Sequence, residues 1–321
     1  MSISMGQVGR TYRRDKMSAN YMRKRWFDSP ETQSAVVNIL QAVKKGGRVE
    51  ARSSPFASLE NGLADFRGID FSGLKIEKVN FDKIDLSFSS FKDSWLRGNS
   101  FDNVKFEKAD FSEVSEGASI FNSAEFLQCS FNRAVVGYDG SRYDNVLFDS
   151  SSFRKTGFIR GEFTNCVFSS CKLKGSDFFA SSFEDCTFEG ILEDVWFRGG
   201  YDVSYADEEF GIAKKNQMKN VSFENAVLYG VHFSNDCDLS TIRLPKAKGY
   251  HLFDNWYKRL LHLSETIIEW PSEQNHEAGI FARSHLVQAK NQNWYVINAS
   301  ELDEEAGEET AGKILAVLNE V

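Results

Sequence analysis

Hydrophobic residues recur with a period of five along most of this chain. Between residues 64 and 239 an aromatic or aliphatic residue stands at almost every fifth position, here called a centre position. A period of five fits neither an α-helix, with about 3.6 residues per turn, nor a strand, whose side chains alternate. The repeat therefore reflects a tertiary unit. The first ten centre positions are Phe66, Phe71, Ile76, Phe81, Leu86, Phe91, Leu96, Phe101, Phe106 and Phe111.

Each unit has a loose motif. Small or β-branched residues precede most centre positions by two, as in Ala64-Asp65-Phe66-Arg67-Gly68 and Ala109-Asp110-Phe111-Ser112-Glu113. In this respect the chain resembles the pentapeptide repeat family. The resemblance implies an all-β fold, a right-handed quadrilateral parallel β-helix in which four pentapeptides complete a coil. About eight coils of this solenoid would fill residues 61–244, between a short N-terminal helix and a mainly helical C-terminal region.

Phenylalanine fills the predicted core. Of the 28 Phe residues, 21 stand at centre positions. Residues one coil apart should stack at the strand spacing of about 4.8 Å, which predicts columns such as Phe71, Phe91, Phe111 and Phe131. Burial of each ring stabilises the fold by about 1.5–3 kcal/mol. We therefore interpret the aromatic columns as structure and predict no cofactor.

The five cysteines also belong to the repeat. Each stands two residues before a centre position, in the slot otherwise taken by Ala, Ser, Val or Thr. A buried free cysteine behaves as a small hydrophobic residue, and the spacing contains no CxxC pair typical of zinc sites. We expect core packing, no disulfide framework and no metal site. The five are Cys129, Cys166, Cys171, Cys186 and Cys237.

The repeat is interrupted at three places. Glu116 occupies a centre position, where an unpaired carboxylate is costly, so its coil should bulge. A two-residue insertion makes a projecting turn at residues 137–142, and residues 198–220 have no register. We expect both loops to contact a partner. The candidate contact residues are Tyr138, Asp139, Arg142, Tyr201, Asp202, Tyr205, Asp207, Glu208 and Glu209.

The N-terminal segment, residues 1–60, contains a basic arm and a capping helix. Basic and aromatic residues alternate in the arm, a composition that can clamp a nucleic-acid strand or pin the arm to the first coil. Ser29 followed by Pro30 predicts the start of a helix that ends at Gly46. The candidate nucleic-acid contacts are Arg13, Arg14, Arg23, Lys24 and Arg25.

The C-terminal region, residues 245–321, departs from the five-residue period. A helix is expected from Leu252 to Ile267, a second from Glu273 to Lys290, then an extended segment, and a last helix with Ser300 as its N-cap. The first helix has an apolar stripe that could cap the last coil or join two copies, so both a monomer and a homodimer stay open. The stripe is Phe253, Trp256, Leu260 and Leu263.

Charge and motifs limit the function. The net charge is −8, yet residues 1–60 hold eleven Lys and Arg against five acids. The N-terminus has no apolar signal region and no run approaches the length of a membrane span, so we expect a cytoplasmic protein without membrane contact. The sequence contains no P-loop, GxGxxG, HExxH or GxSxG motif. These features predict a protein that is not an enzyme.

The favoured function is a binding scaffold. Some proteins of the resembling family are bacterial DNA mimics that protect DNA gyrase or topoisomerase IV, and the interrupted coils here are similar to theirs. A DNA mimic needs a dense negative strip, which the mixed charge of residues 64–192 does not provide. The alternatives are nucleic-acid binding through the basic arm, a toxin- or effector-related interaction, and a small-molecule role of residues 245–321.

Overall fold

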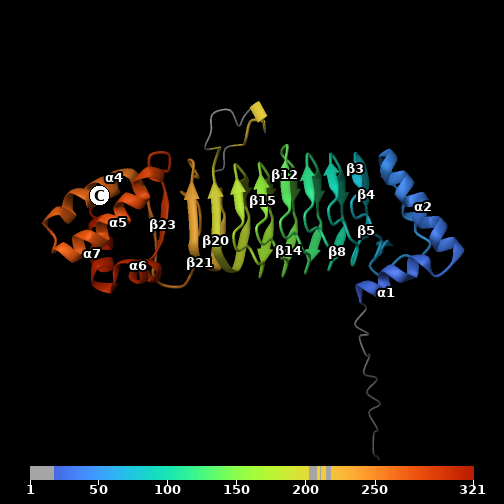
Figure 1. Cartoon of the computed structure of the whole chain (residues 1–321), viewed down its shortest axis with the longest axis horizontal. Coiled ribbons are helices and arrows are strands. Elements are labelled where there is room, and N and C mark those ends of the chain that lie inside the picture. Colours follow the sequence, from blue (N-terminus) through green and yellow to red (C-terminus); the bar gives the residue numbers. More distant parts are fainter. Residues whose placement is uncertain (1–17, 202–207, 210, 215–217) are drawn as a thin grey trace, which may run out of the picture.

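The computed structural model describes residues 18–201, 208–209, 211–214 and 218–321. The chain forms an elongated solenoid with helices at both ends (Figure 1). Each coil has four sides, named here in chain order from Phe66. The sides are parallel ladders whose strands mostly come from residues twenty apart, so Phe81 aligns with Phe101 and Phe126 with Phe106. The predicted β-helical architecture is confirmed.

Three sides are built from regular strands. The first contains β2 (Ala64–Asp65), β5 (Ile84–Asp85), β8 (Lys105–Glu107), β11 (Glu125–Leu127), β14 (Leu147–Asp149) and β17 (Val167–Ser169). The third contains β3 (Lys75–Glu77), β6 (Trp95–Arg97), β9 (Ser115–Gly117), β12 (Val135–Tyr138), β15 (Gly157–Ile159) and β18 (Asp177–Phe179). The fourth contains β1 (Gly47–Val49), β4 (Val79–Asp82), β7 (Ser100–Asp102), β10 (Ile120–Asn122), β13 (Arg142–Asp144), β16 (Glu162–Thr164) and β19 (Ser182–Glu184).

The second side is held by single bridges rather than strands. They join Asp70, Ser90, Asp110, Ser130, Ser152 and Lys172 in succession. Near the C-terminal end the sides merge, because the long strand β20 (Thr187–Arg198) continues around the coil from the first side to the third. It pairs in parallel with β21 (Ser222–Ser234).

The core consists of stacked rings. Phe91 and Phe111 are 4.8 Å apart between centroids, and Phe101 and Phe121 are 4.7 Å apart, with nearly parallel planes. These distances equal the strand spacing, so the coil geometry itself fixes the stacking. Residues two positions after a centre, such as Lys78 and Lys83, take positive φ values and turn the chain to the next side.

The cysteines are buried and free, as expected. The thiol of Cys129 donates to the carbonyl of Phe106 at 3.3 Å, and that of Cys171 to the carbonyl of Phe148 at 3.3 Å. Ser151 donates from the same slot to the carbonyl of Phe126 at 3.0 Å. Burial raises the pKa of Cys129 to about 12, so the thiol remains protonated and available as a donor. These residues satisfy backbone carbonyls of the preceding coil.

The N-terminal end is closed by helices. The segment comprises α1 (Ala19–Lys24), η1 (Arg25–Phe27), α2 (Pro30–Lys45) and η2 (Ala51–Ser53). Ser29 and Thr32 form a capping box at the start of α2, as the Ser-Pro signal predicts. Ile39 and Val43 of α2 are buried against the first coil. The helix therefore covers an apolar edge that a solenoid must protect.

The C-terminal region alternates helices and two strands. It comprises β22 (Tyr250–Phe253), α4 (Trp256–Thr266), η3 (Ile267–Glu269), α5 (Ser272–Ala289), β23 (Tyr295–Asn298), α6 (Ala299–Ala306) and α7 (Glu308–Leu318). Leu252 and Phe253 were expected in a helix, which is wrong, because they pair antiparallel with β23. Asn298, not Ser300, caps α6, and Gly307, at φ 77°, separates α6 from α7.

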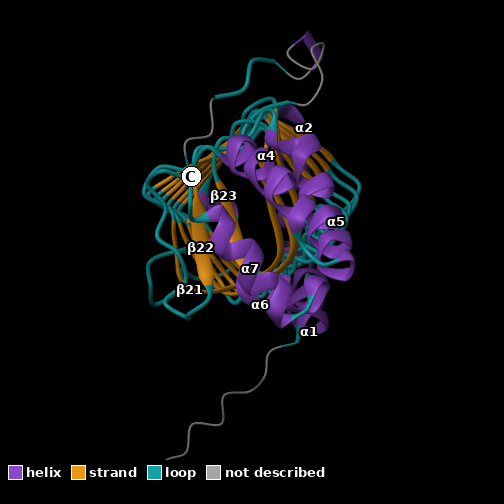
Figure 2. Cartoon of the chain, turned by 90° about the vertical axis from the view of Figure 1, so that its left-hand side faces the viewer, coloured by secondary structure: helices purple, strands orange, loops and turns teal. Residues whose placement is uncertain are grey.

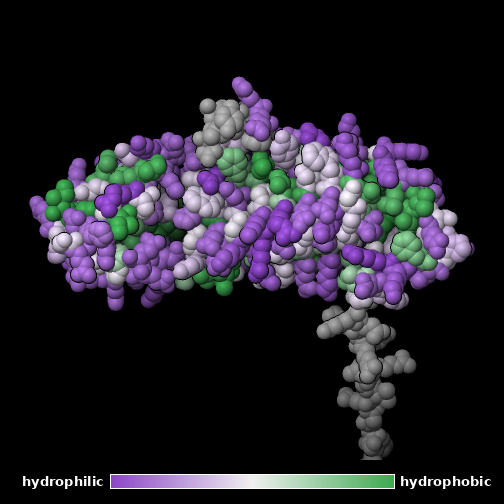
Figure 3. Space-filling view, in the orientation of Figure 1, coloured by the Kyte–Doolittle hydropathy of each residue, from purple (hydrophilic) through white to green (hydrophobic). Residues whose placement is uncertain are grey.

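The β22–β23 ribbon joins the solenoid to the helices. Val296 is buried in the solenoid core, whereas its neighbours Tyr295 and Ile297 lie in a separate helical core. The alternation follows from the period of two in a strand. Seen from this end, the helices lie across the end of the solenoid (Figure 2). In Figure 3 hydrophobic patches mark both helical ends, while much of the middle is hydrophilic.

The predicted apolar stripe lies inside the helical core. Phe253, Trp256, Leu260 and Leu263 are each at most 3% exposed and contact one another and the other C-terminal helices. Of the two roles left open for this stripe, covering the last coil falls in the structure to Tyr250, Leu252 and Val296 of the ribbon. The structure has two hydrophobic cores here because the β22–β23 ribbon has two apolar faces. One face packs on the solenoid and the other on the C-terminal helices.

Candidate binding surface

Glu116 keeps its centre position inside the solenoid. It is 2% exposed, and its carboxylate accepts hydrogen bonds from the Gly137 amide at 2.9 Å, the Ser141 hydroxyl at 2.6 Å and the Tyr143 hydroxyl at 2.7 Å. The predicted bulge in the coil of Glu116 is therefore wrong. The irregularity lies one coil later, where β12 shifts register between Val135 and Tyr138.

The inserted turn of residues 137–142 supplies two of the donors to this carboxylate, the Gly137 amide and the Ser141 hydroxyl. Gly137 and Gly140 have φ values of +83° and +76°, which only glycine adopts without strain. Gly137 also lies against Gly161, since a Cβ on Gly137 would be 3.0 Å from the Gly161 Cα. The Gly137 amide of the insertion thus points to the buried carboxylate, while the Tyr138 side chain is half-exposed.

The third side carries an apolar strip next to this turn. At outward positions, where the repeat normally has polar residues, it presents half-exposed or exposed Val135, Tyr138, Ile159, Phe179 and Trp196. Strands β12, β15, β18 and β20 are adjacent, and Ile159 pairs directly with Phe179. Val135 and Trp196 lie in a second column of the same side, which also contains Gly157 and Asp177. We name these five residues the loop-side strip.

The second loop returns to the same side. The Tyr201 hydroxyl donates to the Gly211 carbonyl at 3.0 Å, and its ring is 5.4 Å from that of Phe179. The Arg160 guanidinium lies beside both loops: a Cβ on Gly140 would be 2.8 Å from its Nη2, and a Cβ on Gly211 would collide with its Nη1. Two loops about sixty residues apart therefore meet around one arginine of the third side.

The predicted loop residues divide into three groups. Tyr138, Asp139 and Tyr201 lie on the third side, where Asp139 forms an ion pair with Arg97. Arg142 is exposed but begins β13 on the fourth side, so it is separated from them. Glu208 and Glu209 are exposed, whereas Asp202, Tyr205 and Asp207 lie outside the described residues.

The sequence interpretation missed Ile159, Arg160 and Phe179. These residues belong to regular five-residue units, whereas the predicted contact residues were chosen only from the interruptions of the repeat. The available signal was a large apolar residue directly after a centre position, as in Phe158-Ile159 and Phe178-Phe179.

The solenoid geometry decides the architecture. Five-residue units form the four sides of each coil, and centre residues and their partners two positions earlier point inward. The chain has the pentapeptide repeat fold. No profile of a known protein family matches the chain, and no curated protein matches it.

Several solved structures are similar to this pentapeptide repeat solenoid. A trypsin-treated form of QnrB1, a plasmid-mediated fluoroquinolone resistance protein, has 15% identity and a TM-score of 0.38, covering 59% of this chain and 88% of that one. HetL, a pentapeptide repeat protein involved in heterocyst differentiation regulation in Nostoc sp. strain PCC 7120, has 13% identity and a TM-score of 0.32, covering 58% and 93%. Rfr23 of Cyanothece 51142 has 7% identity and a TM-score of 0.22, covering 55% and 90%.

The basic arm is tied to the first coil where it is described. Arg25 forms an ion pair with Asp65 at 2.5 Å, and the Trp26 ring nitrogen donates to the Arg67 carbonyl at 2.9 Å. Burial alone would raise the pKa of Asp65, but hydrogen bonds from Arg25 and Arg67 hold it well below its usual range. Arg23 is half-buried and Lys24 is exposed, while Arg13 and Arg14 lie outside the described residues.

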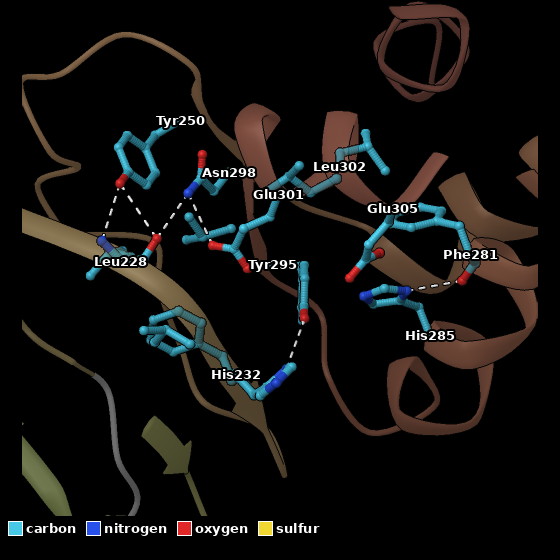
Figure 4. A pocket seen from close by; sticks show the side chains of 14 residues that line it. Leu228, His232, Tyr250, Phe281, His285, Tyr295, Asn298, Glu301, Leu302 and Glu305 are labelled. Atoms are coloured by element: carbon cyan, nitrogen blue, oxygen red, sulfur yellow. Dashed lines mark hydrogen bonds between the residues drawn. The ribbon is translucent and has the colours of Figure 1, made fainter. Parts of the chain in front are cut away.

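A small cavity lies between the last coil and the C-terminal helices (Figure 4). Its volume is about 60 Å³, and its titratable lining residues are His232, Tyr250, His285, Tyr295, Glu301 and Glu305. Burial lowers the pKa of both histidines. The His285 Nδ1–H donates to the Phe281 carbonyl at 2.9 Å, and Glu301 accepts from the Gly230 amide at 2.9 Å. The cavity has space for one or two waters.

The described residues contain neither a membrane-spanning helix nor a cluster of metal ligands. No helix there is long and apolar enough to cross a bilayer. Among the same residues, no group of three or more His, Cys, Asp and Glu side chains is arranged to hold a metal ion.

Proposed function

We propose that this protein is a non-enzymatic scaffold that binds another protein through the third side of its solenoid. The observation that carries the proposal is the convergence of two separate loops at Arg160, next to Phe179 of the loop-side strip. A repeat scaffold of this type holds its surface rigidly, because every coil is fixed by the stacked core.

The composition of this surface supports a protein partner. Tyrosine, tryptophan and arginine dominate the energetically important residues of protein interfaces. The third side presents Tyr138, Trp196, Arg160 and Arg198, and Arg198 lies over the Trp196 ring at 4.4 Å. A rigid aromatic surface loses little entropy on binding, so even a modest contact area can give specific recognition.

The charge pattern favours this mode over DNA mimicry. Several acidic side chains of the solenoid are paired with cations: Asp82 with Arg48 at 2.8 Å, Glu184 with Lys219 at 2.5 Å, and Glu113 with Arg133. Paired carboxylates reduce the negative potential that an imitation of the DNA backbone requires. DNA gyrase or topoisomerase IV is therefore a narrower partner hypothesis, to be judged by titrating the protein into a supercoiling reaction with and without a quinolone. No effect on either reaction would remove it.

The decisive experiment is an affinity capture from a bacterial lysate followed by measurement of binding to the purified partner. The test variant carries Ile159→Asp and Phe179→Asp on the third side. The matched control is Ile120→Asp, an outward residue of the fourth side that is 43% exposed. We expect the test variant to weaken binding by about 100-fold, since central apolar anchors are worth 2 kcal/mol or more, and the control to bind normally.

Two outcomes would contradict the proposal. The first is equal binding by the wild type and the third-side variant, which would assign recognition to another surface. The second is binding lost equally in the control variant. Circular dichroism of all three proteins, compared at the same temperature, separates loss of binding from loss of fold.

A further inference from the structure

The second side of the solenoid carries a short basic groove, distinct from the third side. Its cations are Arg154, Lys155, Lys172 and Lys174, all exposed. Arg154, Lys172 and Lys174 line an open groove of about 410 Å³, which continues to Leu173 and the exposed Ile191. Lys155 follows Arg154 in the chain, next to this groove. In a chain with a net charge of −8, a local cluster of four cations is a marked departure from the average.

Backbone hydrogen bonds fix the spacing of these cations. The Arg133 amide donates to the Arg154 carbonyl at 3.0 Å, the Phe153 amide to the Lys172 carbonyl at 2.8 Å, and the Lys155 amide to the Lys174 carbonyl at 3.4 Å. Arg154, Lys155, Lys172 and Lys174 therefore stand on adjacent coils, about 4.8 Å apart along the solenoid. Like charges at this distance repel one another, and a bound anion would relieve the repulsion.

Only part of this charge is compensated within the chain. Lys174 forms ion pairs with Glu193 at 2.5 Å and with Asp194 at 3.5 Å. Among the described residues, Arg154, Lys155 and Lys172 take part in no ion pair. Three exposed positive charges therefore remain available to a ligand, at fixed positions set by the coils.

An apolar edge adjoins the cations. Ile191 is 65% exposed and stands on the coil after Lys172, and its ladder partner Val227 is 47% exposed. An aliphatic side chain of a ligand could cover both residues. The groove thus offers positive charge on two coils and an apolar surface on the next two.

We propose that this basic groove binds a short acidic segment of a protein that carries one aliphatic side chain. Glu193, which lines the groove, and Asp194 are paired with Lys174. Arg154, Lys155 and Lys172 therefore remain to attract the carboxylates of a bound peptide. The apolar edge also suits a peptide side chain and has no counterpart in a phosphodiester backbone.

Fluorescence anisotropy with the full chain tests this proposal. The probe is a fluorescein-labelled ten-residue peptide of Glu and Asp with one central Leu, and a second probe replaces that Leu by Ser. The test variant is Arg154→Glu with Lys172→Glu. The control is Lys83→Glu with Lys92→Glu, which changes the net charge equally at two other exposed lysines.

We expect the test variant to weaken binding of the Leu peptide by more than about tenfold and the control by less than about threefold, with affinity falling as salt rises. Ile191→Asp should weaken the Leu peptide more than the Ser peptide. Equal loss in test and control variants would overturn the proposal, because it would indicate unspecific attraction. Far-UV circular dichroism establishes that each variant is folded.

Two other results would replace the proposed occupant. A 20-base-pair DNA duplex that binds more tightly than the peptide and is lost in the test variant would identify a nucleic acid. Light scattering that detects dimers or larger assemblies, dissolved by the same variant, would identify a second copy of this chain. The groove proposal does not depend on the third side, since its variants leave Ile159 and Phe179 unchanged.

Discussion

The Tyr143 hydroxyl donates a hydrogen bond of 2.7 Å to the Glu116 carboxylate across 27 positions of the sequence. This contact joins two irregularities that appear unrelated along the chain, a charged centre residue and a two-residue insertion one coil later. The insertion supplies two more donors, the Gly137 amide and the Ser141 hydroxyl. Each irregularity compensates for the other, because a buried carboxylate requires donors and the extra residues provide them.

Replacement of Glu116 by Leu should destabilise the protein strongly. Leu fits the centre position but leaves the three donors without an acceptor, and each buried unsatisfied group costs about 1–3 kcal/mol. We expect a loss of about 3 kcal/mol or more in urea-induced unfolding. Glu116→Gln, which retains one acceptor oxygen, is the matched control and should lose less. A Leu variant as stable as the wild type would contradict the role assigned to the carboxylate.

Stability of the C-terminal region should fall in mild acid. Burial lowers the pKa of His285 in the folded protein. In the unfolded chain this histidine has its ordinary pKa of about 6.5, so on acidification the unfolded chain takes up the proton at a higher pH than the folded protein does. Proton uptake by the unfolded chain lowers the free energy of unfolding. The contribution of neutral His285 to stability is fully present above the unfolded-state pKa of about 6.5 and is lost as the pH falls through the lowered folded-state pKa. His232, Tyr250, Tyr295, Glu301 and Glu305 also face the cavity.

Glu305 acts in the opposite direction, because burial raises its pKa and favours the protonated folded form in acid. Thermal unfolding of the wild type and of His285→Asn at intervals from pH 7.5 to pH 5.5 checks the histidine effect. Asn keeps a donor for the Phe281 carbonyl but does not titrate. A pH slope unchanged by the substitution would rule out His285 as its source.

Arg25 should be essential to the N-terminal end of the solenoid. Its side chain is 13% exposed and the Asp65 side chain is 5% exposed, so Arg25→Ala leaves a buried carboxylate with Arg67 as its remaining cation. We expect a loss of about 2 kcal/mol in chemical denaturation. Arg48→Ala, which breaks the exposed pair with Asp82, should cost less than about 1 kcal/mol. Equal effects of the two substitutions would contradict this account.

Nucleic-acid binding by the arm can now be separated from its structural role. Deletion of residues 1–17 removes Arg13 and Arg14 but retains Arg25 and Trp26, which hold the first coil. If the arm contributes basic contacts, this deletion should abolish retention in a low-salt gel-shift assay while the melting temperature stays unchanged. No retention by the full chain would remove the nucleic-acid hypothesis.

Removal of residues 245–321 should expose the last coil rather than dissociate a dimer. Val296, together with Tyr250 and Leu252, covers the solenoid core at this end, and the predicted dimer stripe is buried within its own helices. We expect the full chain to scatter light as a monomer and the truncated chain to aggregate. A dimeric full chain with a soluble monomeric truncation would instead support the stripe as a dimer contact.

The sequence was most informative where local pattern and tertiary packing agree. The columns of Phe91, Phe111 and Phe131 could be predicted because the same side chain recurs at the same step. Glu116 was misjudged because its stabilising partners are on another coil. Leu252 and Phe253 were misjudged because their apolar spacing fits both a helix and a strand, and pairing with β23 decides between them.

By itself, the sequence determined the five-residue repeat, the inward rings and cysteines, and the positions of the two loops at residues 137–142 and 198–220, since each follows from a period readable along the chain. The tertiary structure alone decided that residues 137–142 enclose Glu116, that Tyr201 reaches Phe179, and that Arg154 and Lys172 share a groove. These relationships depend on how coils stack and loops fold back, which brings together residues that no local pattern connects.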